Sequence, residues 1–198
     1  MDAADLLPDP IAEFGRWLAD ARAAGLELPE AMTLATADAR GLPSARTVLL
    51  KSVDADGFRF FTNTESRKGR ELAENPHAAL VFHWPLEPRR QVTVAGPVAP
   101  LPRAEAEAYY RTRPLGSRLG AWASRQSTVV SGRDALERAF AEAGAAYGDD
   151  PPLPPWWGGY VLSPVRFEFW QNRPNRLHDR FRYERAEGGG WRLARLAP

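Results

Sequence analysis

The sequence predicts a mainly β protein, arranged as an antiparallel meander or barrel with peripheral helices. Between residues 31 and 98 at least five strand-like runs follow one another, joined by connections of hairpin length. Such short connections join antiparallel strands, whereas parallel strands need crossovers of about a dozen residues or more. The chain of 198 residues is long enough for one substantial core. We therefore expect a single domain over residues 1–198, with residues 1–8 as a flexible N-terminal tail.

The first regular element is expected to be an amphipathic helix over residues 10–25. Ile11, Phe14 and Leu18 recur at three- and four-residue steps, which is the spacing of one helical face. Asp9 is a suitable N-cap, and Gly25 is a suitable stop.

Strands follow from residue 31, where the hydrophobic period changes. Turn signals at residues 38–41 and 54–57 separate the first three runs. The expected strands cover residues 32–37, 46–53, 58–62, 78–84 and 91–98, with a short helix over 66–75.

The second half of the chain is expected to contain both helices and strands. Helical patterns cover residues 103–111 and 132–147, and the proline-rich segment 148–155 is expected to be a stiff extended connector. Strand-like runs cover residues 156–171, 180–185 and 191–195. Phe167 and Phe169 alternate with Glu168 and Trp170, so one face of that strand is apolar and the other is mixed.

The composition excludes several classes of function. Basic and acidic residues number 26 and 25, so no global attraction to nucleic acid is expected, and any basic site is local. The absence of cysteine excludes disulfides, thiolate metal sites and cysteine nucleophiles. Three dispersed histidines do not suggest a metal site. The start lacks the pattern of a signal peptide, and no apolar run approaches the roughly 20 residues of a membrane helix, so a cytoplasmic protein without a membrane partner is expected.

Two groups of cations in the first half could bind an anion. Arg46 and Lys51 bracket an apolar strand, and their odd spacing predicts that they point to different faces. Arg67 and Lys68 lie at the start of an expected helix, where basic side chains oppose the helix dipole and a bound phosphate would explain them. Solvated strand ends are the alternative interpretation for Arg46 and Lys51.

Neutral polar residues in three further places could contact a ligand. Gln91 opens a strand, and Gln126 with Ser127 occupies a polar loop, although isolated residues of this kind are usually ordinary surface residues. Tyr109, Arg113 and Ser117 are four residues apart and would share a helical face, a possibility that Pro114 makes doubtful. These three would form a phosphate pocket.

The most informative stretch runs from Trp170 to Arg180. It combines a tryptophan, three arginines and a histidine at the junction of two strand-like runs. Guanidinium groups bind phosphate and flat rings stack on flat rings, so this stretch suits an anionic aromatic ligand. Arg176, His178 and Arg180 would share one face of a strand, although a lone histidine is often structural. No dinucleotide-binding, Walker, zinc-protease or nucleophile-elbow motif is present.

In their order and spacing these motifs resemble the pyridoxamine 5'-phosphate oxidase family. The resemblance runs from Asp9 to Pro198 and is carried by residues 46–51, 66–69, 168–171, 176–180 and 191–198. It implies an FMN-binding split β-barrel of antiparallel Greek-key type, built as a homodimer with two flavin sites at the subunit interface.

The resemblance also assigns residues to roles. The FMN contacts that it implies are Arg46, Thr47, Val48, Leu49, Leu50, Lys51, Phe61, Thr62, Arg67, Lys68, Gln91, Gln126, Ser127, Trp170 and Arg180, partly from the second subunit. The implied substrate contacts are Lys51, Tyr109, Arg113, Ser117, Arg176, Leu177 and His178, and Arg176 and His178 would be the catalytic pair.

The implied reaction is oxidation of pyridoxine or pyridoxamine 5'-phosphate to pyridoxal 5'-phosphate, with O2 as acceptor and H2O2 as product. Family members often carry a basic, tyrosine-containing N-terminal segment over the substrate, and the first ten residues contain nothing similar. Two alternatives therefore stay open. One is a flavin oxidase of another aromatic metabolite, similar to the phenazine-biosynthesis branch, and the other is a non-catalytic flavin- or heme-related binding protein on the same barrel.

Overall fold

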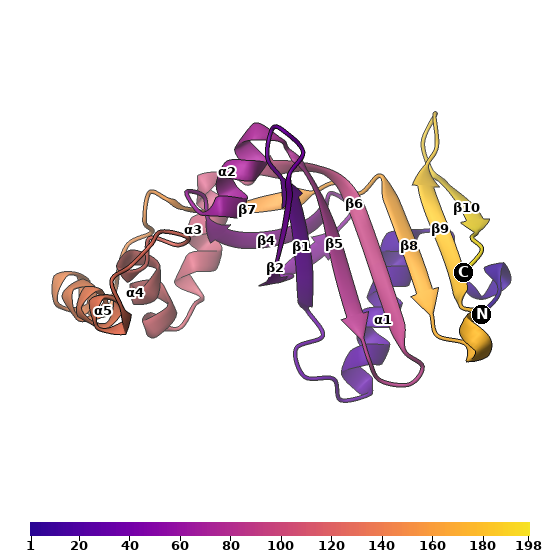
Figure 1. Ribbon diagram of the computed structural model, residues 1–198, viewed down its shortest axis with the longest axis horizontal. Helices are drawn as coiled ribbons and strands as arrows, with labels where there is room; N and C mark the ends of the chain where they lie inside the picture. The colour runs from indigo at the N-terminus through magenta and orange to yellow at the C-terminus, as the bar shows by residue number, and fades with distance from the viewer.

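A curled antiparallel sheet of ten strands forms the body of the protein in the computed structural model, which describes residues 1–198 (Figure 1). Its main path runs β10-β9-β8-β6-β5-β1-β2, and β7 pairs with both β6 and β4, which curls the sheet. Every pairing is antiparallel, as the sequence predicts. The strands are β1 (Ala31–Ala37), β2 (Pro43–Leu49), β3 (Ser52–Asp54), β4 (Gly57–Asn63), β5 (His77–Trp84), β6 (Arg90–Pro100), β7 (Trp157–Leu162), β8 (Arg166–Gln171), β9 (Asp179–Arg185) and β10 (Trp191–Arg195).

Five α-helices flank this sheet. They are α1 (Pro10–Ala23), α2 (Arg67–Glu74), α3 (Arg103–Arg111), α4 (Leu115–Ala123) and α5 (Arg133–Tyr147). Helix α4 was not predicted; it starts directly after Pro114, which ends any continuation of α3 and precedes the first turn of the new helix. Helices α4 and α5 contact each other and project from one end of the sheet (Figure 1). No helix has the length and hydrophobicity needed to cross a membrane.

Helix α1 closes the apolar core against the sheet. The Asp9 carboxylate caps its start by accepting the Ile11 N–H at 3.0 Å. Phe14 packs edge-on against Phe58, with ring centroids 4.9 Å apart, and Trp17 packs in the same way on Phe169 at 5.1 Å. All four rings are almost fully buried, and burial of each contributes about 1.5–3 kcal/mol. This core fixes the position of the sheet on which the candidate site is built.

Residues 1–8, for which the sequence predicts a flexible tail, make defined contacts with the C-terminal strands. The Met1 ammonium lies 3.0 Å from the Asp179 carboxylate, and the Tyr183 hydroxyl donates to the Leu7 carbonyl at 2.7 Å. Arg195 pairs with Asp2 at 2.7 Å. The two ends of the chain therefore lie side by side next to β9 and β10 (Figure 1).

The predicted strand over residues 46–53 is interrupted. Strand β2 ends at Leu49 and β3 begins at Ser52, because Leu50 turns into the core and Lys51 donates its N–H to the Arg59 carbonyl of β4. The expectation that Arg46 and Lys51 point to different places was therefore wrong, since the alternation of faces holds only along an unbroken strand. Both side chains border the same cavity.

The run over residues 156–171 is likewise two strands. Strand β7 ends at Leu162 and β8 begins at Arg166, with Pro164 between them. Proline has no N–H to give to a ladder, so the chain leaves one part of the sheet here and enters the next. Ser163 and Val165 still donate to the carbonyls of Pro97 and Ala95 in β6, which holds the crossover against the sheet.

Candidate functional site

A cavity of about 1010 Å³ lies where β2 and β4 meet α2, α3 and α4. Its volume is that of a site for a cofactor-sized ligand. The walls are Ser44, Ala45, Arg46, Thr47, Val48, Leu49, Lys51, Phe61, Thr62, Asn63, Arg67, Lys68, Tyr109, Thr112, Arg113, Pro114, Ser117, Gly120, Ala121, Ser124, Gln126, Ser127 and Trp157.

The charge of these walls is entirely positive. Five of the 23 lining residues are cationic, namely Arg46, Lys51, Arg67, Lys68 and Arg113, and none is aspartate or glutamate. The protein as a whole has a net charge of only +1. A cavity lined by one sign of charge focuses the field and attracts an oppositely charged ligand, so the chemistry of this lining selects anions.

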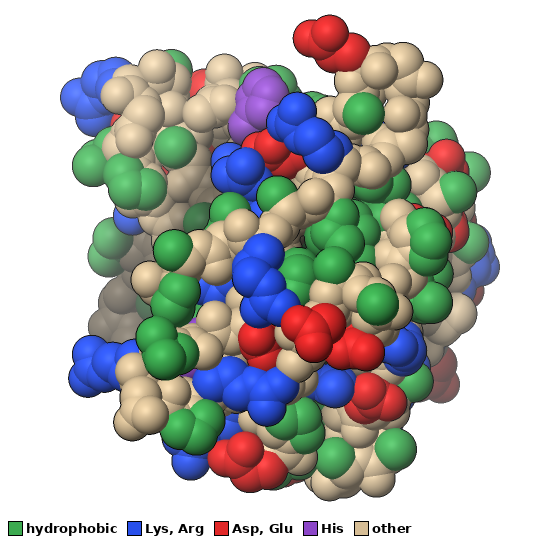
Figure 2. Space-filling view, turned by 90° about the vertical axis from the view of Figure 1, so that its right-hand side faces the viewer, with side chains coloured by type: hydrophobic (Ala, Val, Ile, Leu, Met, Phe, Trp, Pro, Cys, Tyr) green, Lys and Arg blue, Asp and Glu red, His purple; other side chains and the backbone are tan.

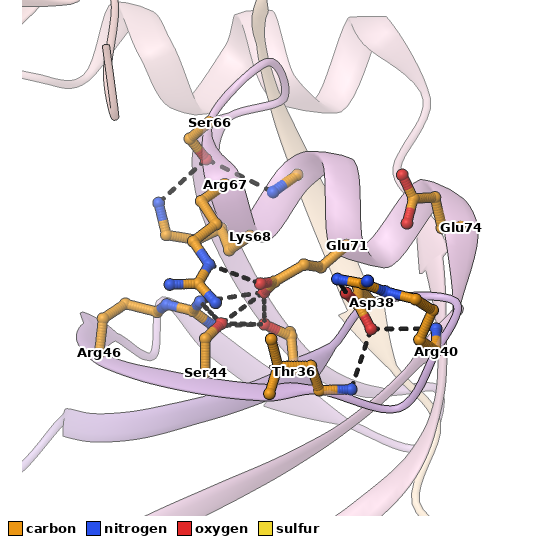
Figure 3. Close-up of polar contacts among 12 residues, drawn as sticks. Thr36, Asp38, Arg40, Ser44, Arg46, Ser66, Arg67, Lys68, Glu71 and Glu74 are labelled. Atoms are coloured by element: carbon orange, nitrogen blue, oxygen red, sulfur yellow. Dashed lines mark hydrogen bonds and ion pairs between the residues drawn. The ribbon is translucent and has the colours of Figure 1, made fainter. Parts of the chain in front are cut away.

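Two cations of the cavity wall, Arg46 and Arg67, are arranged around the buried carboxylate of Glu71 (Figure 3). Glu71 on α2 accepts from Arg46 at 3.1 Å and from Arg67 at 2.8 Å, and it also accepts the hydroxyls of Thr36 and Ser44. Burial alone would raise the pKa of Glu71, but these four hydrogen bonds outweigh burial and lower it to about 2. The carboxylate is therefore ionised at any working pH.

Lys68 lies at the start of α2, directly beside this group. The Ser66 hydroxyl caps the helix by accepting the Gly69 N–H at 3.4 Å. The Lys68 ammonium donates to Thr62 at 3.0 Å, to Ser66 at 3.1 Å and to Gln126 at 2.7 Å, all neutral groups. Burial, together with the nearby charge of Arg46, lowers the pKa of Lys68 to about 8. The bond to Gln126 also ties the 124–132 loop to the cavity.

Gly69 allows the first turn of α2 to pack against the backbone of the connection from β4. A Cβ at this position would lie 2.0 Å from the Thr64 carbonyl oxygen, which is backbone that cannot move aside. Only glycine fits, and the close approach places Arg67 and Lys68 over the cavity.

The other end of the cavity is aromatic. Phe61 stacks on Tyr109 with centroids 4.2 Å apart, and Trp157 lies parallel to Phe61 at 5.6 Å. The Lys51 ammonium is 5.6 Å from the Tyr109 ring, and the Arg113 guanidinium is 5.0 Å from the Trp157 ring. Cations over aromatic faces are held in position without being neutralised.

Arg113 carries an unmet hydrogen-bonding requirement. Its Nη1 is buried and has no hydrogen-bond partner in the protein. Burial also lowers the pKa of Arg113, although an arginine remains charged. A buried guanidinium nitrogen without a partner is costly, and the residue that carries it lines the cavity, which is where an anionic ligand would meet the guanidinium.

The structure brings most of the predicted site residues together in this cavity. Those lining it are Arg46, Thr47, Val48, Leu49, Lys51, Phe61, Thr62, Arg67, Lys68, Tyr109, Arg113, Ser117, Gln126 and Ser127. Leu50 does not line it, because its side chain is buried in the core. Tyr109 and Ser117 belong to different helices and do not share one helical face. Both reach the cavity because the chain turns at Pro114 between α3 and α4.

The remaining predicted residues form a separate group at the other end of the sheet, here called the C-terminal cluster. Its members are Gln91, Trp170, Arg176, Leu177, His178 and Arg180, none of which lines the cavity. Gln91, Trp170 and Arg180 lie opposite one another on β6, β8 and β9, and three strands, β6, β5 and β1, separate β8 from β2. One chain therefore holds the predicted site residues in two separate groups.

Within the C-terminal cluster the side chains are ordered by local contacts. The rings of Trp170 and His178 lie 4.6 Å apart, and His178 Nδ1 accepts the Arg173 N–H at 3.2 Å. Arg180 pairs with Glu168 at 2.8 Å. On this side of the molecule Lys and Arg side chains alternate with acidic ones (Figure 2).

Arg176 and His178 do not lie on a strand, contrary to the prediction that they share a strand face with Arg180. Residues Pro174–Arg176 form a 3-10 turn, and β9 begins only at Asp179. Arg176 has a φ of 60°, in the left-handed region that residues with a side chain seldom adopt. Both Arg176 and Leu177 are exposed.

The sequence did not predict the residues that hold Arg46 in place by hydrogen bonds. Glu71, Thr36 and Ser44 bind Arg46 but do not belong to any motif that the sequence suggested. One signal was available, because Glu71 follows Arg67 by four residues on a predicted helix, which is ion-pair spacing. Trp157, which is not among the predicted site residues, packs edge-on against Tyr110 and also lines the cavity.

Two family profiles match the chain. The one described as pyridoxamine 5'-phosphate oxidase matches residues 18–146, and the one described as pyridoxine 5'-phosphate oxidase C-terminal dimerisation region matches residues 157–198. Curated relatives include the pyridoxine/pyridoxamine 5'-phosphate oxidase of Paraburkholderia phymatum, 55% identical over 198 residues, and pyridoxine/pyridoxamine 5'-phosphate oxidase 1 of Ralstonia nicotianae, 57% identical over 198 residues. Each alignment covers 100% of this chain and 93% of the relative.

Solved structures give the same fold. PhzG from Burkholderia lata 383, in complex with tetrahydrophenazine-1-carboxylic acid, has a TM-score of 0.92 and 37% identity over 98% of this chain and 95% of its own. A pyridoxamine 5'-phosphate oxidase-related, FMN binding protein from Nostoc punctiforme has a TM-score of 0.74 and 22% identity over 92% of this chain and 96% of its own. The second likeness concerns the fold alone, and identifies it as the split barrel.

Proposed function

The chain belongs to the pyridoxamine 5'-phosphate oxidase family, and from this we propose that it uses FMN to oxidise pyridoxine or pyridoxamine 5'-phosphate to pyridoxal 5'-phosphate. In this proposal O2 is the electron acceptor and H2O2 the second product. The observation that carries the proposal is the cavity with five cations and no carboxylate, divided into a group around Glu71 and a group around the Tyr109 and Trp157 rings. Two groups of cations in one cavity suit two anionic ligands, a phosphorylated cofactor and a phosphorylated substrate.

The residues around Glu71 fit the phosphate of FMN. Arg46, Arg67 and Lys68 supply three positive charges against the single charge of Glu71, an excess that a phosphate dianion would balance. Gln126 and Ser127 on the adjoining loop offer the neutral donors and acceptors that the polar edge of an isoalloxazine requires. When bound, FMN would supply the two-electron redox chemistry that amino-acid side chains lack.

The residues at the aromatic end fit the phosphate of the substrate. Lys51 and Arg113 would pair with it, and the hydroxyls of Tyr109 and Ser117 would donate to it. The unpartnered Nη1 of Arg113 supports this assignment, since a ligand oxygen would meet its hydrogen-bonding requirement. The role of these four residues is to orient the substrate, and orientation is a large part of the catalysis in such reactions.

We further propose that the protein acts as a homodimer in which the C-terminal cluster of one subunit completes the cavity of the other. Support comes from the separation of the two groups in one chain and from the match of residues 157–198 to a dimerisation region. Trp170, Gln91 and Arg180 would then contact the flavin, and Leu177 would contact the substrate. Arg176 would stabilise developing charge, and His178 would hold or accept a proton from the substrate amine or alcohol.

An oxidase acting on another aromatic metabolite is the second candidate. It is favoured by the 0.92 TM-score with PhzG, whose structure contains tetrahydrophenazine-1-carboxylic acid. The identity to that protein is 37%, against 55–57% to the pyridoxine/pyridoxamine 5'-phosphate oxidases. Lys51 with Tyr109, Arg113 and Ser117 also supports a phosphorylated substrate. The test is whether pyridoxine 5'-phosphate reduces the FMN-loaded protein in the absence of oxygen.

The affinity for FMN is expected to fall as the pH rises above 8. Only the ammonium form of Lys68 attracts a phosphate, and burial with the charge of Arg46 lowers the pKa of Lys68 in the free protein to about 8, from 10.5. Above pH 8 binding must take up a proton, so the Kd should rise by up to about tenfold per pH unit. Flavin fluorescence titrations of the apo-protein between pH 7 and 9 measure this.

The matched control for this titration is Lys68→Arg, since a guanidinium keeps its charge throughout the range. Its Kd should change little with pH. The stability of the apo-protein has the opposite trend: between pH 8 and 10.5 the unfolded chain binds more protons, so the free energy of unfolding should rise with pH. A wild-type Kd that is constant between pH 7 and 9 would contradict the role given to Lys68.

A further inference from the structure

Glu71 is the one acid that pairs with cations lining the cavity, namely Arg46 and Arg67. It lies in α2 with a side chain only 6% exposed, and its two carboxylate oxygens accept hydrogen bonds from different residues. Oε1 accepts from Arg67, while Oε2 accepts from Arg46, Thr36 and Ser44 (Figure 3). Glu71 does not line the cavity itself, so any effect that it has on a ligand passes through other residues.

Arg67 depends on Glu71 for its orientation. Its side chain is 56% exposed, and its Nε–H donates to Glu71 at 2.8 Å, which is its one hydrogen bond in the protein. Its Nη1 and Nη2 remain for a ligand. A long exposed side chain without that contact would sample many rotamers, and ordering it would weigh against ligand binding.

Arg46 is held from the same side. Its Nη2 donates to Glu71 at 3.1 Å and to Ser44, and its Nη1 donates to Thr36 and to the Leu34 carbonyl at 3.1 Å. These bonds fix the guanidinium plane at the wall of the cavity. The single carboxylate of Glu71 therefore links two guanidinium groups that come from different elements, β2 and α2.

We propose that Glu71 is a positioning residue, which pre-orders Arg46 and Arg67 for the phosphate of the ligand. The inference rests on the proposed FMN site. It assigns to Glu71 the preference of the protein for FMN over riboflavin, which has the same ring system and ribityl chain but no phosphate. Pre-organised donors bind an anion more tightly than mobile ones of the same charge.

The sign of the effect separates positioning from simple charge. Replacing Glu71 by glutamine removes a negative charge beside the phosphate position, and Coulomb's law alone predicts tighter binding of FMN. Loss of positioning predicts weaker binding, because both guanidinium groups lose their common anchor. We expect positioning to prevail, with an increase of about tenfold in the Kd for FMN.

The experiment measures the Kd of FMN and of riboflavin for the apo-protein by quenching of flavin fluorescence. Glu71→Gln should weaken FMN binding and leave riboflavin binding unchanged. The matched control is Glu74→Gln, which removes the same charge from the same helix at an exposed position that accepts only the Ala39 N–H. Its FMN affinity should equal or slightly exceed that of the wild type. An unchanged or tighter FMN Kd in Glu71→Gln would overturn the inference.

A second variant keeps the inference testable if Glu71→Gln does not fold. Thr36→Val removes a hydroxyl that contacts both Glu71 and Arg46 without changing charge, shape or cavity lining. It should weaken FMN binding in the same direction by a smaller factor, about threefold, and an unchanged FMN Kd would count against positioning. Wild-type protein that binds riboflavin as tightly as FMN would overturn the proposed phosphate site itself.

Discussion

Replacing Arg113 by alanine should raise the KM for pyridoxine 5'-phosphate by about 10- to 100-fold, the effect of losing one charge-assisted hydrogen bond. The guanidinium is held over the Tyr110 and Trp157 rings, and its buried Nη1 lacks a partner in the protein. In the proposed complex that nitrogen donates to the substrate phosphate. Steady-state peroxide formation measures KM and kcat, and the FMN content of the purified variant should equal that of the wild type.

Two comparisons show whether the effect comes from the phosphate. Arg111→Ala removes an exposed arginine at the end of α3, two residues before Arg113, that pairs with Glu107 at 2.7 Å, and its KM should not change. Unphosphorylated pyridoxine should be a poor substrate for the wild type, and Arg113→Ala should not make it poorer. An equal loss with both substrates would mean that Arg113 supports the fold of the cavity rather than binding phosphate.

Mixing two inactive variants should restore activity, because the cavity and the C-terminal cluster are proposed to come from different subunits. One variant carries Lys51→Ala and Arg113→Ala in the cavity, and the other carries Arg176→Ala and His178→Ala in the C-terminal cluster. Random exchange makes half of the dimers mixed, and each mixed dimer has one intact site and one doubly damaged site. Purified mixed dimers are therefore expected to have about half the activity of the wild type, and an unselected random mixture about a quarter.

The measurement is peroxide formation after co-expression of the two variants with different affinity tags and purification through both tags. Each variant alone, and a mixture made without subunit exchange, should stay near background. A mixed dimer that is no more active than its parents would place the complete site within one chain. That outcome would contradict the shared-site proposal, in which the cavity of one subunit and the C-terminal cluster of the other form one site.

Many of the helices and strands could be predicted from local sequence patterns. The Asp9 cap, the spacing of Phe14 and Leu18 and the stop at Gly25 located α1 to within two residues. The break between β2 and β3 at Leu50 could not be predicted. An apolar residue within an apolar run gives the same local pattern whether the strand continues or turns into the core. Helix α4 was missed since its Gly- and Ser-containing sequence has weak propensity, and contacts with α5 stabilise it.

Some residues of the candidate site could likewise be predicted from the sequence, and others could not. Cations such as Arg67 and Lys68 could be identified because their position at a helix start is unfavourable without an anion. The hydroxyls of Thr36 and Ser44 could not be identified in this way. They donate to Glu71 only because the fold brings β1 and β2 beside α2. The separation of Arg176 and His178 from the cavity also follows from strand order, which local sequence does not specify.

The central claim is that this chain couples an FMN site to oxidation of a phosphorylated B6 vitamer. The most direct test mixes the FMN-loaded protein anaerobically with pyridoxine 5'-phosphate and records the flavin absorbance. Our account predicts that the flavin bleaches and that its colour returns when oxygen is admitted. A flavin that stays yellow with both pyridoxine and pyridoxamine 5'-phosphate would contradict it, and would favour an oxidase of another aromatic substrate or a flavin-binding protein without this activity.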